Sequence, residues 1–143
     1  MIDPSEESRL FHEGIVLFNK GEWFEAHEVW EDIWHMASGD KKRFYQGLIQ
    51  CAVTIEHIRR GNPRGTVTVF DSANAKFTGL PDVYMGINIK QLIEQIGDMV
   101  STIRTLPAQM FEPRKGRGLE LPVDLTNAPK IQLKHDPFGN INQ

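Results

Sequence analysis

The segment from residue 23 to residue 34, WFEAHEVWEDIW, holds all three tryptophans of the chain beside a histidine and four carboxylates. Within it, His27 and Glu31 stand four positions apart, so on a helix their side chains can touch. A carboxylate that holds an imidazole ring selects its tautomer, as in a general base with its orienting group. The same contact also occurs as a structural hydrogen bond. The pair therefore indicates either a reaction centre or a structural contact on the surface of a helix.

The same two residues begin a pattern that resembles a metal-binding motif. Residues 27–31 read HEVWE, whereas the HExxH motif of zinc proteases uses two histidines as metal ligands. Glu31 takes the second ligand position, and His57 would supply a third ligand from elsewhere in the chain. Two histidines and one carboxylate leave a position open on a divalent metal ion. His27, Glu31 and His57 are therefore candidate metal ligands, and a metal-dependent hydrolase-type enzyme is the alternative hypothesis for the function.

Helical periodicity divides the segment into two faces, because each helical residue turns by about 100°. The apolar face holds Trp23, Ala26, Val29, Trp30, Ile33, Trp34 and Ala37. The opposite, charged face holds Glu25, Glu28, Asp32 and His35. Most of the charge is thus the solvated side of a helix, and the tryptophans are predicted core residues. His27 and Glu31 fall on the border between the two faces, beside Trp34 and Phe24.

The next predicted helix has a similar border. Its apolar face holds Phe44, Leu48, Cys51, Ala52, Ile55 and Ile58, so Cys51 is predicted to be a buried small hydrophobe. Gln46, Gln50 and His57 lie on the other side, which is either a solvent face or part of a site. If the two helices pack antiparallel, their polar borders meet. His27, Glu31, Gln50 and His57 would then line a pocket between aromatic walls.

These segments belong to a predicted all-α fold, a compact bundle of about five helices. Helices are expected over residues 4–19, 22–37, 40–60, 63–78 and 88–106, with Ser5 capping the first and residues 82–87 forming a loop. Two helical hairpins followed by a C-terminal helix would form a bundle domain over residues 1–106.

Residues 107–143 have a different composition, which is rich in proline and glycine. Residues 119–123 and 130–134 alternate apolar and polar side chains, which predicts short strands. Residues 114–117, RKGR, are expected to be a solvated loop, with anion binding as the alternative. This irregular tail is predicted to pack on the bundle or on a partner chain, and a homo-oligomer is one such arrangement.

Composition narrows the class of protein. The length of 143 residues suits one domain, and the net charge of −3 argues against a nucleic-acid binder, which needs a basic face. A single cysteine allows no internal disulfide. No stretch approaches the roughly 20 apolar residues of a membrane span, and the acidic start lacks the features of a signal peptide. We expect a cytoplasmic protein that does not insert into a membrane.

Three ordered motifs resemble the signatures of domain-of-unknown-function family 309 (DUF309). They run from Phe18 through GxWFEAHExxExxW to Trp34, from Phe44 through YQGLIQ to Ala52, and from His57 through xxxGN to Gly65. The family is a small all-α bundle found in soluble microbial and plastid proteins, with no assigned activity. The run of β-branched residues at 66–69 and the tail after Pro107 depart from its pattern.

The resemblance also bears on the candidate site. The polar and aromatic positions that match the motifs are predicted ligand-binding residues: His27, Glu28, Glu31, Trp34, Gln46, Gln50 and His57. The leading hypothesis is a small helical module that binds a small molecule or a protein partner there. A divalent metal is the one cofactor that the residues suggest.

Overall fold

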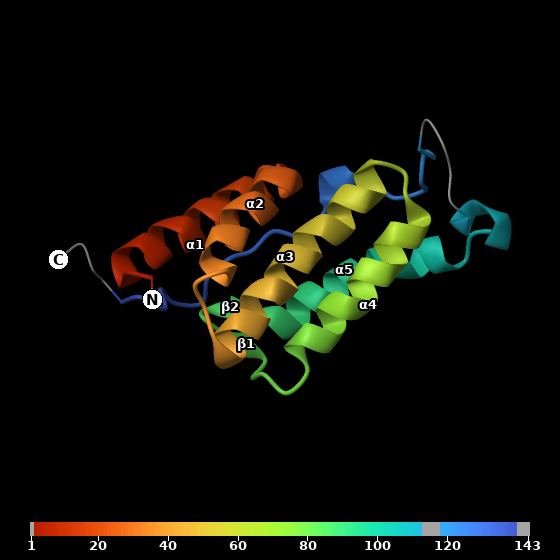
Figure 1. Ribbon diagram of the computed structural model, residues 1–143. Helices are drawn as coiled ribbons and strands as arrows, with labels where there is room; N and C mark the ends of the chain where they lie inside the picture. Colours follow the sequence, from red (N-terminus) through yellow and green to blue (C-terminus); the bar gives the residue numbers. More distant parts are fainter. Residues whose placement is uncertain (1, 113–117, 140–143) are drawn as a thin grey trace.

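The described residues of this computed structural model, 2–112 and 118–139, fold mainly into five α-helices (Figure 1). In chain order these are α1 (Pro4–Asn19), α2 (Trp23–Trp34), α3 (Gly39–Arg59), α4 (Pro63–Phe77) and α5 (Ile89–Arg104). Two short strands, β1 (Val83–Tyr84) and β2 (Ile87–Asn88), precede α5, and two 3₁₀ turns, η1 (Ala108–Phe111) and η2 (Leu125–Asn127), follow it. The predicted all-α class is confirmed.

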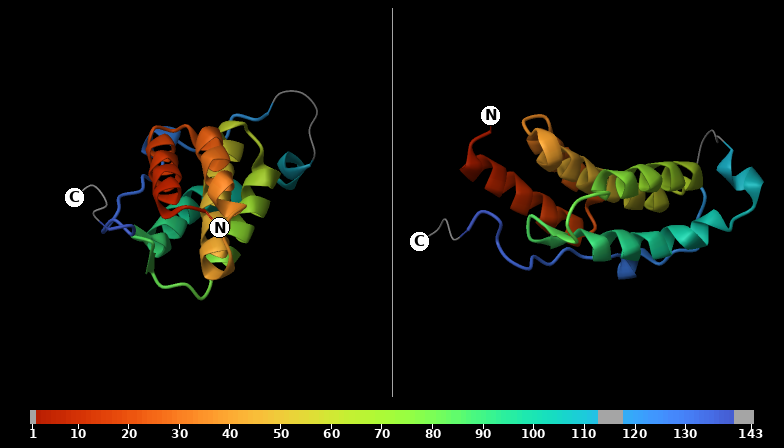
Figure 2. Two further views of the ribbon diagram at one scale, coloured as in Figure 1. Left: turned by 60° about the vertical axis from the view of Figure 1, so that its left-hand side comes forward. Right: turned by 90° about the horizontal axis from the view of Figure 1, so that it is seen from below.

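α3 is the central helix of the bundle. It packs against α2 on one side and α4 on the other, while α1 covers α2 and α5 packs on α4. Figure 2 shows α5 and the tail together beneath the layer that contains α3 and α4. Short turns connect α1 to α2 and α3 to α4, so each pair is a helical hairpin, as the sequence predicted. No helix in the described part of the chain is long and apolar enough to cross a bilayer.

The cap of α1 and the end of α2 differ most from the prediction. α1 is capped by Asp3 rather than Ser5, because the helix begins at Pro4 and the side chain of residue 3 accepts the N–H of Ser5. Its carboxylate also accepts the Ser5 hydroxyl at 2.8 Å. α2 ends at Trp34, three residues early, because the N–H groups of Met36 and Ala37 bond the carbonyls three residues before them. Such bonds tighten the chain into a turn and end the helix.

The loop expected at residues 82–87 contains a β-hairpin. β1 and β2 pair antiparallel around Met85 and Gly86, whose φ angles are 51° and 77°. Positive φ at both central residues matches the twist of two-residue hairpins. The tail passes close by, since a Cβ on Gly86 would lie 2.3 Å from the carbonyl oxygen of His135. The hairpin is thus part of the surface on which the tail packs.

The tail crosses the molecule in an extended conformation from the α3–α4 turn to α1 (Figures 1 and 2). Its Leu121 and Ile131 side chains are buried against the helices. The strands expected at 119–123 and 130–134 do not form, although the predicted alternation in burial is present in both segments. Instead of a neighbouring strand, the amide side chain of Asn19 pairs with both the N–H and the carbonyl of Ile131. Residues 114–117 lie outside the described residues.

Trp30 occupies the centre of the α1–α2 contact. Its side chain is fully buried, and its indole N–H donates to the carbonyl of Phe11 at 3.3 Å. The ring lies flat against Gly14, where an added Cβ would come within 2.0 Å of the indole nitrogen. α1 can therefore approach α2 this closely only if residue 14 lacks a side chain.

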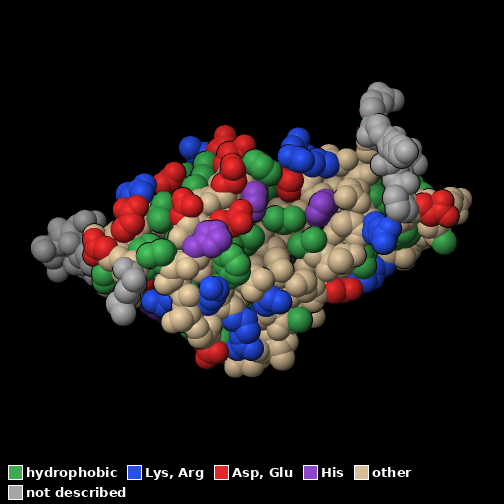
Figure 3. Space-filling model, viewed as in Figure 1, with side chains coloured by type: hydrophobic (Ala, Val, Ile, Leu, Met, Phe, Trp, Pro, Cys, Tyr) green, Lys and Arg blue, Asp and Glu red, His purple; other side chains and the backbone are tan. Residues whose placement is uncertain are grey.

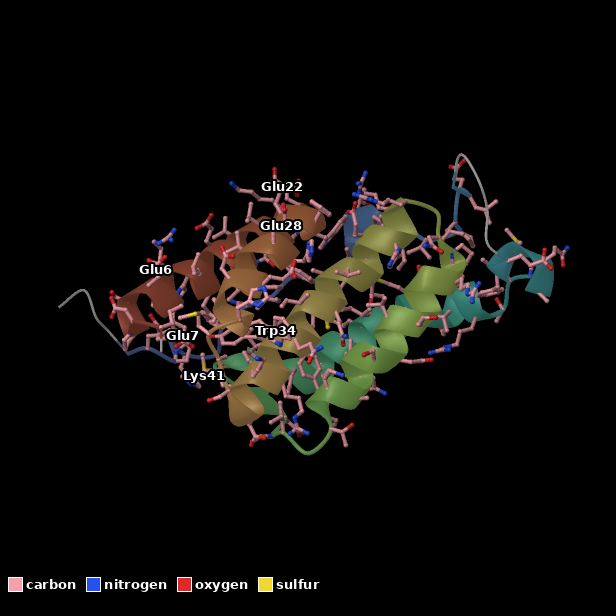
Figure 4. The ribbon with its side chains drawn as sticks, viewed as in Figure 1. Glu6, Glu7, Glu22, Glu28, Trp34 and Lys41 are labelled. Atoms are coloured by element: carbon pink, nitrogen blue, oxygen red, sulfur yellow. The ribbon has the colours of Figure 1, made fainter. Side chains whose placement is uncertain are left out.

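A buried polar cluster joins α1 to α3. Glu7 is almost completely buried, and its carboxylate accepts the hydroxyl of Tyr45 at 2.6 Å. Lys41 forms a salt bridge with the same carboxylate at 3.3 Å, and Figure 4 shows the two side chains next to each other. Burial has the largest effect on the Tyr45 hydroxyl, and the hydrogen bond to Glu7 has the next largest. Both raise its pKa, so the hydroxyl keeps its proton and remains a donor. The contact satisfies a carboxylate that would otherwise be costly to bury.

We predict that Gly14→Ala lowers the free energy of unfolding by about 1–2 kcal/mol, because the added methyl group overlaps the indole of Trp30. Urea unfolding followed by tryptophan fluorescence measures the loss. Gly97→Ala is the matched control, since the nearest atom to its Cβ is Phe70 Cζ at 3.2 Å. The control should stay within about 1 kcal/mol of wild type. Equal effects of the two substitutions would contradict the close packing at Gly14.

Candidate functional site

The candidate site begins with a row of side chains where α2 meets α3. Phe24, His27, Glu31 and Trp34 follow each other at helical spacing and so share one side of α2. The guanidinium of Arg60 lies 5.3 Å from the Phe24 ring centre, and the Lys42 amine lies 4.8 Å from that of Trp34. The first contact joins the start of α2 to the end of α3. The second joins the end of α2 to the start of α3. The helices are therefore antiparallel, which is the condition under which their polar borders meet, and we call this row the α2–α3 border.

His27 and Glu31 form the contact that their spacing predicts. The His27 Nε2 atom lies 2.8 Å from a Glu31 carboxylate oxygen, and Nδ1 lies 2.6 Å from the carbonyl oxygen of Phe24. A backbone carbonyl can only accept, so Nδ1 carries a proton. Both contacts are satisfied together when the ring carries protons on both nitrogens and donates to Glu31. The ring is 18% exposed and packs edge-on against Phe24, so its orientation is held from three sides.

His57 has a different set of partners, at the turn between α3 and α4. Its Nδ1 atom lies 3.2 Å from the side-chain amide nitrogen of Asn62, and the oxygen of that amide accepts the N–H of Gly65. Asn62 thereby caps α4. Burial, reinforced by the charge of Arg60 and opposed by Glu56, lowers the pKa of His57. The contact with Asn62 requires an Nδ1 atom that accepts a hydrogen bond. The neutral ring with an unprotonated Nδ1 can accept the Asn62 N–H.

The proposed metal ligands His27, Glu31 and His57 do not assemble. Within residues 2–112 and 118–139, no group of three or more histidine, cysteine, aspartate or glutamate side chains could hold a metal ion. The reason is local: His27 already bonds Glu31 and a carbonyl, while His57 packs over Gly65 in the α3–α4 turn. The HEVWE pattern is thus a helix with a His–Glu contact and lacks the third ligand.

The other predicted positions on the border, Trp34, Gln46 and Gln50, are half-buried. The indole N–H of Trp34 and the side-chain carbonyl oxygen of Gln50 are buried, and neither has a hydrogen-bond partner among the described residues. An unpaired buried donor or acceptor costs roughly 1–3 kcal/mol. The border thus carries one donor and one acceptor that the described part of the chain leaves unsatisfied.

The charged side of α2 adjoins this border. Glu28, Val29, Glu31, Asp32 and His35 line an open hollow of about 460 Å³. Figure 3 shows acidic side chains gathered over α1 and α2, with histidines beside them over α2 and α3. In Figure 4 Glu28 is directed away from the bundle, whereas Trp34 lies between α2 and α3. Of the predicted site residues, Glu28 alone lies on this outer face of α2, which we define by Glu25, Glu28, Asp32 and His35.

Three residues of the site were missed in the sequence. Lys42 and Arg60 reach aromatic rings on another helix, and no local pattern reveals such a contact. Asn62 had a usable signal, because an asparagine directly before a helix-opening proline is a typical N-cap.

The chain also lacks an activated thiol at the border, since burial raises the pKa of Cys51, which lies inside the core.

Comparison with known proteins supports the family resemblance. The model of a domain of unknown function, DUF309, matches residues 11–69. This stretch includes α2, all of α3 and the turn that holds His57, Asn62 and Gly65. The resemblance predicted from the three sequence motifs is therefore confirmed.

Two curated relatives are similar to this chain, and both are uncharacterized proteins. One, from Aquifex aeolicus (strain VF5), is 28% identical over 103 residues, which cover 71% of this chain and 31% of the relative. The other, YpuF from Bacillus subtilis (strain 168), is 29% identical over 106 residues, which cover 69% of this chain and 60% of the relative. The chain thus spans less than two thirds of the length of either protein.

We predict that His57 makes the fold less stable as the pH falls. Its lowered pKa means that the folded state favours the neutral ring, so stability is retained above the ordinary value of 6.5 and lost as the pH drops through the folded-state pKa. Thermal unfolding between about pH 7.5 and pH 5 measures this loss. His57→Gln should remove part of the pH dependence, while His35→Gln, at an exposed site, should retain it. An unchanged pH profile in His57→Gln would contradict the assignment.

Proposed function

We propose that this protein is a non-catalytic binding module that holds a basic segment of a protein partner on the outer face of α2 and the adjoining α2–α3 border. The hollow lined by Glu28, Val29, Glu31, Asp32 and His35 is the observation that carries the proposal. It combines the negative charges of Glu28 and Asp32, which form no salt bridge within the described residues, with an apolar floor at Val29, and the exposed ring of Phe24 lies on the same helix.

The charge on this face is unfavourable to the helix itself. Glu25, Glu28 and Asp32 are spaced by three and four residues, and like charges at these spacings destabilise a helix by roughly 0.2–0.5 kcal/mol per pair. Within the described residues, Glu28 and Asp32 form no salt bridge. The nearby cation Arg9 is already paired with Glu6 and Glu13. Lysine or arginine side chains of a partner would relieve this repulsion.

The shape of the hollow favours a macromolecular partner over a small molecule. All five lining residues come from α2 and its C-cap, so within residues 2–112 and 118–139 a single helix forms the surface. Small-molecule sites bury most of the ligand, which requires walls from several elements. A helix or an extended segment of another protein can instead lie along the helix and contact it continuously.

The border residues have supporting roles in this proposal. The ring of His27 holds the Glu31 carboxylate at the edge of the hollow through its Nε2 contact. The exposed ring of Phe24, with Arg60 stacked on it, offers an apolar contact at the other end of the row. Gln50 and His57 lie farther along α3, where Gln50 has a buried oxygen without a described partner. They would contact only a segment that reaches across the border.

The test uses short arginine-containing and lysine-containing peptides as probes, with serine-containing peptides of equal length for comparison. Binding is mapped by NMR chemical-shift changes on the full chain. We predict shifts concentrated in residues 24–35, and Glu28→Gln with Asp32→Asn should weaken binding by about fivefold, or roughly 1 kcal/mol. His27→Ala should also weaken binding, because it releases Glu31.

The matched control is Glu94→Gln with Asp98→Asn, on α5. These two carboxylates are also exposed and four residues apart, so the control removes the same charge with the same spacing. It should change peptide affinity by less than about twofold. If both double variants lose affinity equally, the peptides respond to net charge alone and the proposed surface is wrong.

A further inference from the structure

A second groove lies on the other layer of the molecule, between α5 and the tail. Its volume is about 210 Å³, and its lining comes from the start of α5 with β2 and from residues 130–134. The lining residues are Ile87, Asn88, Gln91, Leu92, Gln95, Lys130, Ile131, Gln132 and Lys134. None of them belongs to the α2–α3 border or to the outer face of α2. In contrast to the acidic outer face of α2, both charged residues of this groove are lysines.

Two different periodicities create its walls. On the helical side Asn88, Gln91 and Gln95 are spaced by three and four residues, so their amides form one row along α5. On the tail side the chain is extended, and successive side chains point in opposite directions. Ile131 is therefore buried while its neighbours Lys130 and Gln132 are exposed.

Hydrogen bonds fix the tail wall at both ends. The amide of Asn19 accepts the Ile131 N–H at 2.7 Å and donates to the Ile131 carbonyl at 2.8 Å. Three residues later, the N–H of Lys134 donates to the carbonyl of Gly86 in the hairpin at 2.7 Å. Because Asn19 ends α1 and Gly86 belongs to the β-hairpin that leads into α5, the distance between the two walls is set by the fold and the groove is preformed.

The polar side chains of the groove can all donate hydrogen bonds, and its charged side chains are all positive. The oxygen of the Asn88 side chain accepts the N–H of Gln91 and caps α5, which leaves the amide N–H groups of Asn88 available. Lys134 forms no salt bridge within the described residues, and no carboxylate lines the groove. The start of α5 adds the positive end of a helix dipole. Lysines with amide donors are well suited to phosphate oxygens.

We propose that this groove binds a small organic phosphate, with Lys134 contacting the phosphate, and with Lys130 and the amides of Gln91, Gln95 and Gln132 contacting hydroxyl groups. Leu92 and Ile131 form an apolar floor for the carbon skeleton. Lys130 also donates to the carbonyl of Asn19 at 3.2 Å, so one of its three N–H groups positions the amine at the end of the groove. The volume limits the ligand to a skeleton of a few carbons.

The experiment is isothermal titration calorimetry of the full chain with glycerol 3-phosphate, inorganic phosphate, sulfate and glycerol as probes. We predict that glycerol 3-phosphate binds more tightly than inorganic phosphate, because only the ester presents hydroxyl groups to the amides. Lys134→Gln should weaken its binding by about tenfold, the loss expected for one charge-assisted contact. Gln95→Leu should lower the affinity for glycerol 3-phosphate and leave that for inorganic phosphate unchanged.

Lys90→Gln is the matched control, because Lys90 is an exposed lysine of the same helix that does not line the groove. It should bind the ester as wild type does. The proposal is wrong if Lys90→Gln and Lys134→Gln weaken binding equally, if sulfate competes as well as the ester, or if no heat is detected up to about 10 mM ligand. Tighter, Lys134-dependent binding of a single-stranded oligonucleotide would also overturn it in favour of nucleic acid.

Discussion

The burial of Trp30 against Gly14 is the contact on which the arrangement of α2 depends. Once the indole lies between α1 and the core, the rotation of α2 about its own axis is set. Ala26 and Ile33 must then face inward with Trp30, and Glu28 and Asp32 must face solvent. The same rotation leaves His27 and Glu31 at the edge. A residue larger than glycine at position 14 would push α2 away and move both of its faces.

The motifs that mark the family therefore combine packing with surface chemistry. In the third motif, His57, Gly61, Asn62 and Gly65 build one turn. Gly61 has a φ of 71°, and a Cβ there would meet the carbonyl oxygen of Leu119 at 1.8 Å, so the turn also receives the tail. Asn62 caps α4 and bonds His57. These four residues are explained by structure, which leaves the first motif as the main source of the proposed binding surface.

Opposite charge separates the two proposed binding surfaces of the molecule. The outer face of α2 is acidic because a regular helix must expose one side, and that side carries Glu25, Glu28 and Asp32. The α5–tail groove is basic because an extended segment presents Lys130 and Lys134 on the same side. The overall charge of −3 averages over these regions and hides the local basic one. Partners of opposite charge can thus be distinguished by surfaces that share no residue.

The sequence alone determined the helices, their hairpin order and the contact between His27 and Glu31, because each depends on spacing within one element. Tertiary structure decided everything that needed two elements. The alternation at 130–134 correctly indicated which side chains are buried, but Asn19 replaced the expected neighbouring strand. His57 does not join the predicted metal ligands, because the residues that it contacts follow it in the chain, in the α3–α4 turn. Periodicity states which way a side chain points from its own element, and only packing states what it meets.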